Sequence, residues 1–207
     1  YRLKRDKGTV PQEWIDYSTK VPSRRIAQFF AMYPAHRDAK AALRWVVANA
    51  KTYNINTDYI TVGGGSAGAV TGITLGISNN EDYRDEIDTD QDPTLASTNL
   101  DQNYKVKTIL DFWGSKVALD ILENIYGHQR FDSNDPSLFI AHGTEDPTVL
   151  FSKAEELKII YEANGVPVAY YPLEGKKHGA WGAKVNTRRL EELAFDFIVE
   201  QQNLIVE

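Results

Sequence analysis

The chain of 207 residues is 42% hydrophobic and 25% charged, a composition typical of one globular domain with a sizeable core. A formal net charge of −6 argues against a nucleic-acid partner, and no apolar run approaches the length of a membrane span, so neither partner is expected. Because cysteine is absent, disulfides, thiol catalysis and thiolate metal sites are excluded, while the compartment stays open.

The first quarter of the chain predicts little regular structure before one helix. Residues 1–33 contain two prolines and have no steady hydrophobic period, so we expect an irregular surface segment there. The aromatic side chains of this segment could form a partial lid over a site or pack on the surface: Trp14, Tyr17, Phe29 and Phe30. A helix is predicted over residues 34–53, because Pro34 suits a first helical turn and apolar residues then recur at helical spacing.

A strand is predicted over residues 59–64 and a helix over residues 67–77. The polar, acidic residues 79–104 then predict a solvated loop. Within it, residues 88–92 resemble the start of a calcium-binding loop, but Pro93 and Asn99 occupy the positions that require glycine and glutamate. A loose ion site in this loop therefore stays open as an alternative.

Strands and helices alternate through the rest of the chain. Strands are predicted over residues 106–112, 137–141 and 166–171, and helices over residues 117–126, 152–163 and 187–202. Ser152 and Glu155 are spaced as a capping box, and Gly165 suits a left-handed helix end. This alternation predicts an α/β fold with a mostly parallel sheet and helices on both faces, in which ligands bind at the carboxyl ends of the strands.

Ser66 stands in the sequence GGSAG, residues 64–68, between the predicted strand and helix. This G-x-S-x-G pattern is typical of a nucleophile elbow, whose sharp turn leaves no room for side chains two positions before and after the serine. The helix behind it would aim N–H groups at the site, where negative charge develops. Two alternatives remain: a turn serine without chemical role, and a phosphate loop, because residues 63–68 also match G-x-G-x-x-G. The phosphate interpretation lacks an acidic residue at the end of a second strand.

A serine nucleophile needs a base, and the base needs a group that fixes its tautomer. Asp146 follows the strand predicted over residues 137–141, and His178 follows the strand predicted over residues 166–171. With Ser66, these residues follow three strands of one sheet and can meet at the same edge. The carboxylate has alternatives, since Glu145 is adjacent and an Asp before Pro also favours a turn. The other histidines are expected to have surface or structural roles: His36, His128 and His142.

Four segments resemble α/β-hydrolase esterases of the small carboxylesterase type, which include acetyl and feruloyl esterases. The segments are the elbow at residues 64–68, D-F-x-G at 111–114, H-G-x-x-D-P-x-V at 142–149 and G-x-x-H-G at 175–179. The resemblance covers roughly residues 34–200. It implies that Ser66 is the nucleophile, His178 the general base and acid, and Asp146 the orienting carboxylate.

An oxyanion and binding region is expected beside the serine. The resemblance implies that the backbone N–H of Ala67 stabilises an oxyanion, with Gly65 on the other side of the serine. Trp113 and Trp181 each fall near a predicted strand-end loop, so they could line an acyl or alcohol pocket or belong to the core. The family's second oxyanion donor lies on an H-G-G-G loop, which this sequence lacks.

We therefore expect residues 1–207 to be a single domain that forms the C-terminal part of a longer α/β-hydrolase domain, with the early strands upstream of Tyr1. The expected reaction is the hydrolysis of carboxylic esters, with short acyl groups or carbohydrate-linked esters as substrates and no cofactor or metal. A peptidase or amidase on the same fold and a non-catalytic binding module remain as alternatives.

Overall fold

The computed structural model describes residues 10–84, 93 and 98–206. The contacts between residues divide the chain into two compact units. The first unit comprises residues 1–57, 78–104 and 120–129, and the second comprises residues 58–77, 105–119 and 130–207. The candidate catalytic side chains all belong to the second unit.

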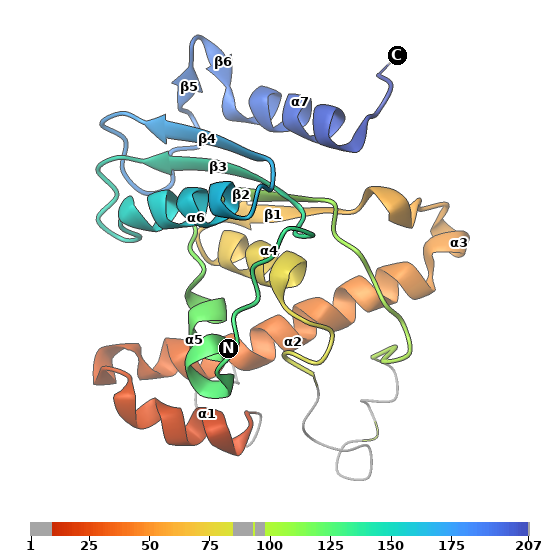
Figure 1. The fold of residues 1–207 in the computed structure, drawn as a ribbon, viewed down its shortest axis with the longest axis vertical. Helices are drawn as coiled ribbons and strands as arrows, with labels where there is room; N and C mark the ends of the chain where they lie inside the picture. Colours follow the sequence, from red (N-terminus) through yellow and green to blue (C-terminus); the bar gives the residue numbers. More distant parts are fainter. Residues whose placement is uncertain (1–9, 85–92, 94–97, 207) are drawn as a thin grey trace. The chain divides into compact units, whose positions relative to one another are not determined.

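The second unit is built on a four-stranded parallel sheet (Figure 1). Its strands are β1 (Thr61–Gly65), β2 (Thr108–Phe112), β3 (Ser137–Gly143) and β4 (Val168–Leu173), hydrogen-bonded in that order. Every residue of β3 is buried, as is typical of a parallel strand that is covered on both faces. The predicted parallel sheet is therefore confirmed, and the carboxyl ends of its strands lie along one edge.

Helices cover both faces of this sheet, as predicted. α4 (Ala67–Ile77) packs on β1 and β2, and α6 (Ser152–Ala163) packs on β3 and β4. α7 (Leu190–Gln202) covers the opposite face, where it packs on β2 and β3 (Figure 1). In this core the ring centroids of Phe139 on β3 and Phe197 on α7 lie 6.0 Å apart. α5 (Val117–Tyr126) lies where the sequence predicts it.

α7 begins later than predicted. Residues 188–189 form strand β6 (Arg188–Arg189), which pairs with β5 (Lys184–Val185), so the helix begins at residue 190 rather than 187. The backbone N–H of Arg189 donates to Glu192 Oε2 at 2.7 Å, which supplies the cap at this later position.

The ends of α6 give one correction and one confirmation. The capping box predicted for Ser152 and Glu155 does not form, because Phe151, whose side chain has no acceptor, occupies the N-cap position. Gly165 has a φ of 69°, which confirms the predicted left-handed residue after this helix.

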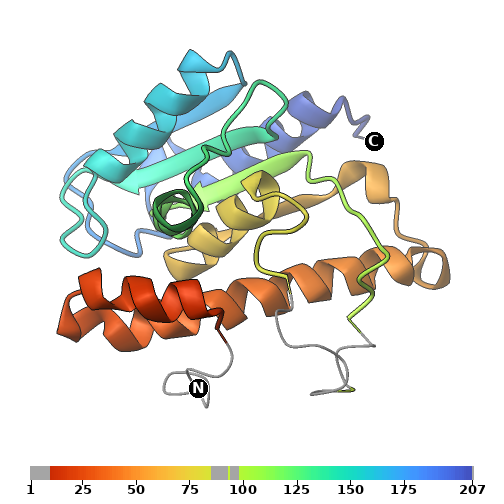
Figure 2. The same cartoon turned by 60° about the horizontal axis from the view of Figure 1, so that its bottom comes forward.

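The first unit is more regular than the sequence predicts. It begins with α1 (Gln12–Tyr17), η3 (Ser18–Lys20), η4 (Ser23–Arg25) and α2 (Ile26–Ala48), and α3 (Ala50–Tyr53) follows. The chain passes from the first unit to the second within η5 (Thr57–Tyr59). α1 lies along the N-terminal part of α2 (Figure 2). The predicted irregular segment is therefore wrong from residue 12 onward, and Pro34, the predicted helix start, falls inside α2.

An aromatic cluster accounts for this additional order. The Trp14 ring lies 5.0 Å from Phe29 and 5.2 Å from Tyr33, and all three side chains are buried. Such aromatic pairs stabilise a fold by roughly 0.5–1.5 kcal/mol each beyond the buried area. Packing between the two helices therefore outweighs the weak local pattern of residues 1–33.

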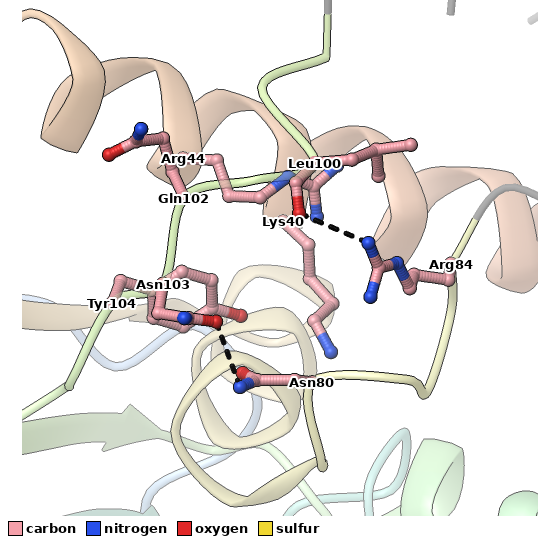
Figure 3. Close-up of a pocket in the computed structure, with 8 residues that line it drawn as sticks. All are labelled: Lys40, Arg44, Asn80, Arg84, Leu100, Gln102, Asn103 and Tyr104. Carbon is pink, nitrogen blue, oxygen red and sulfur yellow. Dashed lines mark hydrogen bonds between the residues drawn. The ribbon is translucent and has the colours of Figure 1, made fainter.

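Two basic side chains of α2 donate hydrogen bonds to backbone oxygens in the described parts of residues 79–104. Lys40 Nζ donates to the backbone oxygen of Asp82 at 2.7 Å, and Arg44 Nε donates to Thr98 O at 2.8 Å. Burial lowers the pKa of Lys40 to about 8. Figure 3 shows side chains from α2 and from both ends of the loop around one pocket.

The predicted solvated loop is wrong for part of this segment, because Asp82 and Tyr83 are buried. The calcium-like residues 88–92 lie outside the described residues. Among the described residues, no group of three or more His, Asp or Glu side chains is placed to hold a metal ion.

Candidate active site

Ser66 lies at the sharp turn between β1 and α4. It is one of the few non-glycine residues with positive φ, at 57°, and its N–H donates to the Phe112 carbonyl at 2.9 Å. A Cβ atom at Gly64 would lie 3.0 Å from the Gly68 carbonyl carbon, which explains the glycine two positions before the serine. A Cβ atom at Gly68 would meet nothing within 4 Å. The expectation of a steric need for glycine at residue 68 is therefore wrong.

The His178 imidazole lies between a hydroxyl and a carboxylate. Its Nδ1 is 2.7 Å from Asp146 Oδ2, and its Nε2 is 2.9 Å from Ser66 Oγ. Because an ionised carboxylate only accepts, Nδ1 carries the hydrogen, and Nε2 is free to accept from the serine hydroxyl. The structure thus brings these three residues, distant in sequence, into one continuous hydrogen-bonded chain.

Asp146 is buried and held from two directions. Its Oδ1 accepts the N–H groups of Thr148 at 2.8 Å and Val149 at 3.0 Å, while Oδ2 faces His178. Burial alone would raise the pKa of Asp146, but the hydrogen bonds from His178 and the two backbone donors outweigh it and hold the pKa below its ordinary value. Glu145, the alternative carboxylate, is exposed, and the His178 hydrogen bond goes to Asp146.

Backbone hydrogen bonds join the loops that carry the carboxylate and the imidazole. The Thr144 N–H donates to Leu173 O at 3.1 Å, and the Glu145 N–H donates to Lys176 O at 3.0 Å. These bonds connect the segment after β3 with the segment after β4. The separation of Asp146 and His178 is thereby set by main-chain contacts as well as by their own hydrogen bond.

Two indole rings lie at the elbow, beside Gly65. A Cβ atom at Gly65 would be 2.7 Å from Trp181 Cζ2 and 3.1 Å from Trp113 Nε1, so only glycine leaves room for both rings. The rings meet edge to face at 4.6 Å, and the Trp113 ring is 6.4 Å from the His178 ring. Trp113 is buried, whereas Trp181 is 57% exposed. Trp181 therefore presents an open aromatic surface next to Ser66.

Asp111 supports the turn that carries Trp113. Its Oδ1 accepts the Gly114 N–H at 2.6 Å, and Trp113 takes a positive φ of 47° within this turn. Complete burial raises the pKa of Asp111 to about 7. In the sequence, Asp111 is the first residue of the D-F-x-G segment, but the pattern gives it no role. Its burial and its contact with Gly114 show that it stabilises this turn.

Ala67 is the first residue of α4. The first N–H groups of a helix have no intrahelical acceptor and carry partial positive charge. The Ala67 N–H therefore belongs to the donors that the start of α4 presents beside Ser66.

The other histidines differ in their surroundings. His36 is buried on α2 and stacks on Tyr83 at 4.8 Å, and His128 is exposed. His142 is fully buried at the end of β3, 3.4 Å from Asp146 Oδ2.

None of the described helices is long and apolar enough to cross a membrane.

Comparison with known proteins gives matches over most of the chain. Residues 15–130 match the family described as BD-FAE. Esterase LipQ of Mycobacterium tuberculosis (strain ATCC 25618 / H37Rv) is 25% identical over 195 residues, which cover 80% of this chain and 44% of LipQ. The chain thus spans less than half the length of this curated relative.

Solved structures resemble the fold at lower identity. A truncated form of a carbohydrate esterase from gut microbiota has a TM-score of 0.62 at 21% identity, covering 82% of this chain and 68% of that chain. Thermogutta terrifontis esterase 2, phosphoramylated by tabun, has a TM-score of 0.63 at 23% identity, covering 85% and 67%. The family match, which covers more than half of the chain, and the parallel sheet together show that the chain belongs to the BD-FAE family and has the α/β-hydrolase fold.

Proposed function

We propose that the chain carries the catalytic site of a serine hydrolase that cleaves carboxylic esters through an acyl-enzyme on Ser66. The observation that carries this proposal is the continuous path from Asp146 through His178 to Ser66, with separations of 2.7 and 2.9 Å. The BD-FAE family match and the similarity to Esterase LipQ support ester hydrolysis over other acyl transfers.

Acylation begins with attack of Ser66 Oγ on the ester carbonyl carbon. The hydroxyl proton moves to His178 Nε2, and the Asp146 carboxylate stabilises the imidazolium through its hydrogen bond to Nδ1. The carbonyl oxygen becomes an oxyanion, which the Ala67 N–H at the start of α4 stabilises. When the tetrahedral intermediate collapses, the bond to the alcohol oxygen breaks and His178 returns its proton to that oxygen.

Deacylation repeats these steps with water. Water gives a proton to His178 Nε2 and attacks the acyl carbon, and the second tetrahedral intermediate then releases the carboxylic acid. Ser66 Oγ recovers its proton from the imidazolium. All the proton transfers pass through His178, so this chemistry needs no metal or cofactor.

The proposed substrates are short-acyl or carbohydrate-linked esters. The exposed indole of Trp181, which rests edge to face on buried Trp113, offers a flat apolar surface beside the nucleophile for an acyl group or a sugar ring. One similar structure is named as a carbohydrate esterase, and another, of Thermogutta terrifontis Est2, has propionate bound.

A panel of chromogenic substrates tests this function. We expect hydrolysis of p-nitrophenyl acetate and butyrate, slower hydrolysis of the octanoate ester, and little release from the matching acetanilide. Ser66→Ala should abolish hydrolysis and serves as the control for contaminating esterase. Faster cleavage of the anilide would favour an amidase, and equal rates for Ser66→Ala and wild type would exclude the proposed nucleophile.

A further inference from the structure

The imidazole of His142 lies next to the proposed catalytic residues, although no proposed step uses it. His142 is the penultimate residue of β3 and is fully buried. Its Nε2 lies 2.8 Å from the Val149 carbonyl oxygen and 3.4 Å from Asp146 Oδ2. A second histidine therefore faces the carboxylate that also binds His178.

The contacts of His142 define its protonation state. The Val149 carbonyl can only accept, so Nε2 carries a hydrogen. Nδ1 is buried and has no hydrogen-bond partner within residues 10–84, 93 and 98–206. A second hydrogen there would be an unsatisfied buried donor, which costs roughly 1–3 kcal/mol. Burial also lowers the pKa of the His142 imidazole, so this side chain is neutral at pH 7.

Val149 links His142 to the carboxylate. Its N–H donates to Asp146 Oδ1 at 3.0 Å, and its carbonyl accepts from His142 Nε2. Both backbone polar groups of Val149 are therefore hydrogen-bonded, the N–H to the Asp146 carboxylate and the carbonyl to His142 on the buried strand β3. The bond from His142 anchors the turn whose N–H groups hold Asp146.

The neutral state of His142 also matters for the charge at the site. The charged and titratable groups that act on it are Asp146 and His178, and the ring of Phe151 packs against it at 6.1 Å. A cationic His142 would attract Asp146 Oδ2 and repel the imidazolium that forms on His178. A neutral His142 does not compete with the imidazolium of His178 for the negative charge of Asp146.

We propose that His142 is a positioning residue for this reaction: in its neutral form it fixes the turn at residues 146–149 and so aims Asp146 at His178. The inference rests on the proposed function, because a carboxylate needs aiming only if His178 works as the base. It predicts that loss of the Nε2 donor reduces turnover while substrate binding is retained.

Three variants of His142 separate the hydrogen bond from mere packing. H142F and H142N remove a donor from the Nε2 position, whereas the longer amide of H142Q can still reach the Val149 carbonyl. With p-nitrophenyl acetate we expect kcat to fall by up to about 100-fold in H142F and H142N, with KM within about twofold, as for a misplacement of ~1 Å. H142Q should recover most of kcat. The exposed His128 gives the matched control, and H128F should have wild-type kcat.

The pH profile distinguishes positioning from a loss of folded protein. In H142F and H142N the acid limb of the kcat profile should move to lower pH, because the carboxylate no longer stabilises the imidazolium of His178 as well; H142Q should keep the wild-type limb. Wild-type kcat and acid limb in H142F or H142N would overturn the inference. Equal losses in folded H142Q and H142N would also overturn it. If the wild type does not hydrolyse the ester, the proposed function itself is wrong.

Discussion

Among individual side chains, Asp146 provides the sharpest test of how the site works. Replacing Asp146 by Asn keeps the size of the side chain, but the N–H groups of Thr148 and Val149 retain its one oxygen as their acceptor. The NH2 group of the Asn side chain then faces His178 Nδ1, where the carboxylate oxygen had accepted a hydrogen bond. We expect Asp146→Asn to lower kcat by about 10⁴-fold with little change in KM, because the imidazole then adopts the wrong tautomer. Steady-state hydrolysis of p-nitrophenyl acetate measures this.

The neighbouring carboxylate supplies the control for that variant. Glu145 is exposed, and the His178 hydrogen bond goes to Asp146. Glu145→Gln should therefore keep wild-type kcat. A large loss in Glu145→Gln, together with an active Asp146→Asn, would mean that Glu145 rather than Asp146 orients His178.

The sequence identifies residues whose chemistry is visible in a motif. Ser66, Asp146 and His178 follow three strands in an interpretable order, so their meeting at one edge can be predicted from the chain alone. Asp111 and His142 could not be assigned in this way. Their roles depend on burial and on contacts with backbone groups, which a single sequence does not display.

The packing of α4 against β1 can be tested with two glycines of the same helix. A Cβ atom at Gly72 would lie 3.0 Å from Gly63 Cα, whereas a Cβ atom at Gly68 would meet nothing within 4 Å. Alanine favours a helix over glycine by about 1 kcal/mol at either position. Because both variants share this gain, overpacking should leave Gly72→Ala less stable than Gly68→Ala by about 1–3 kcal/mol.

Gly68→Ala is the matched control, since it should be neutral or should stabilise the protein. Urea denaturation of both variants measures the difference. Equal stabilisation by the two substitutions would mean that α4 does not approach β1 as closely as the structure describes.

Helices and strands differ in how well the sequence predicts them. Those of the second unit follow clear periodic patterns, and the four parallel strands lie close to their predicted ranges. The start of α2 could not be predicted, because Pro34 resembles a first-turn residue and the order before it comes from contacts such as Trp14 with Phe29. The late start of α7 depends on the pairing of β5 with β6, which residues 184–189 do not signal.

For the whole molecule, buried titratable groups set how stability varies with pH. Burial raises the pKa of Asp111 to about 7, above the value of about 3.9 expected in the unfolded chain. A raised pKa contributes stability that is present below the unfolded pKa and lost as pH rises through the folded pKa. Asp111 therefore makes the wild type less stable at pH 8 than at pH 5.

Asp111→Asn keeps an oxygen that can accept the Gly114 N–H but does not titrate. Relative to wild type, its free energy of unfolding should rise by about 2–3 kcal/mol between pH 5 and pH 8. Urea denaturation at both pH values measures this change. A constant difference between Asp111→Asn and wild type would mean that Asp111 titrates normally.

The fold class is confirmed by the parallel sheet and by the structural similarities. It follows from alternation of strands and helices, which is a property of the chain's pattern rather than of any one contact.

The most direct measurement is covalent labelling with a fluorophosphonate, with the modified residue located by mass spectrometry. We predict one label, on Ser66, that depends on the base, so that labelling is lost in His178→Ala and strongly slowed in Asp146→Asn. Absence of label from folded wild-type protein, or label on a serine other than Ser66, would be incompatible with the proposed acyl-enzyme.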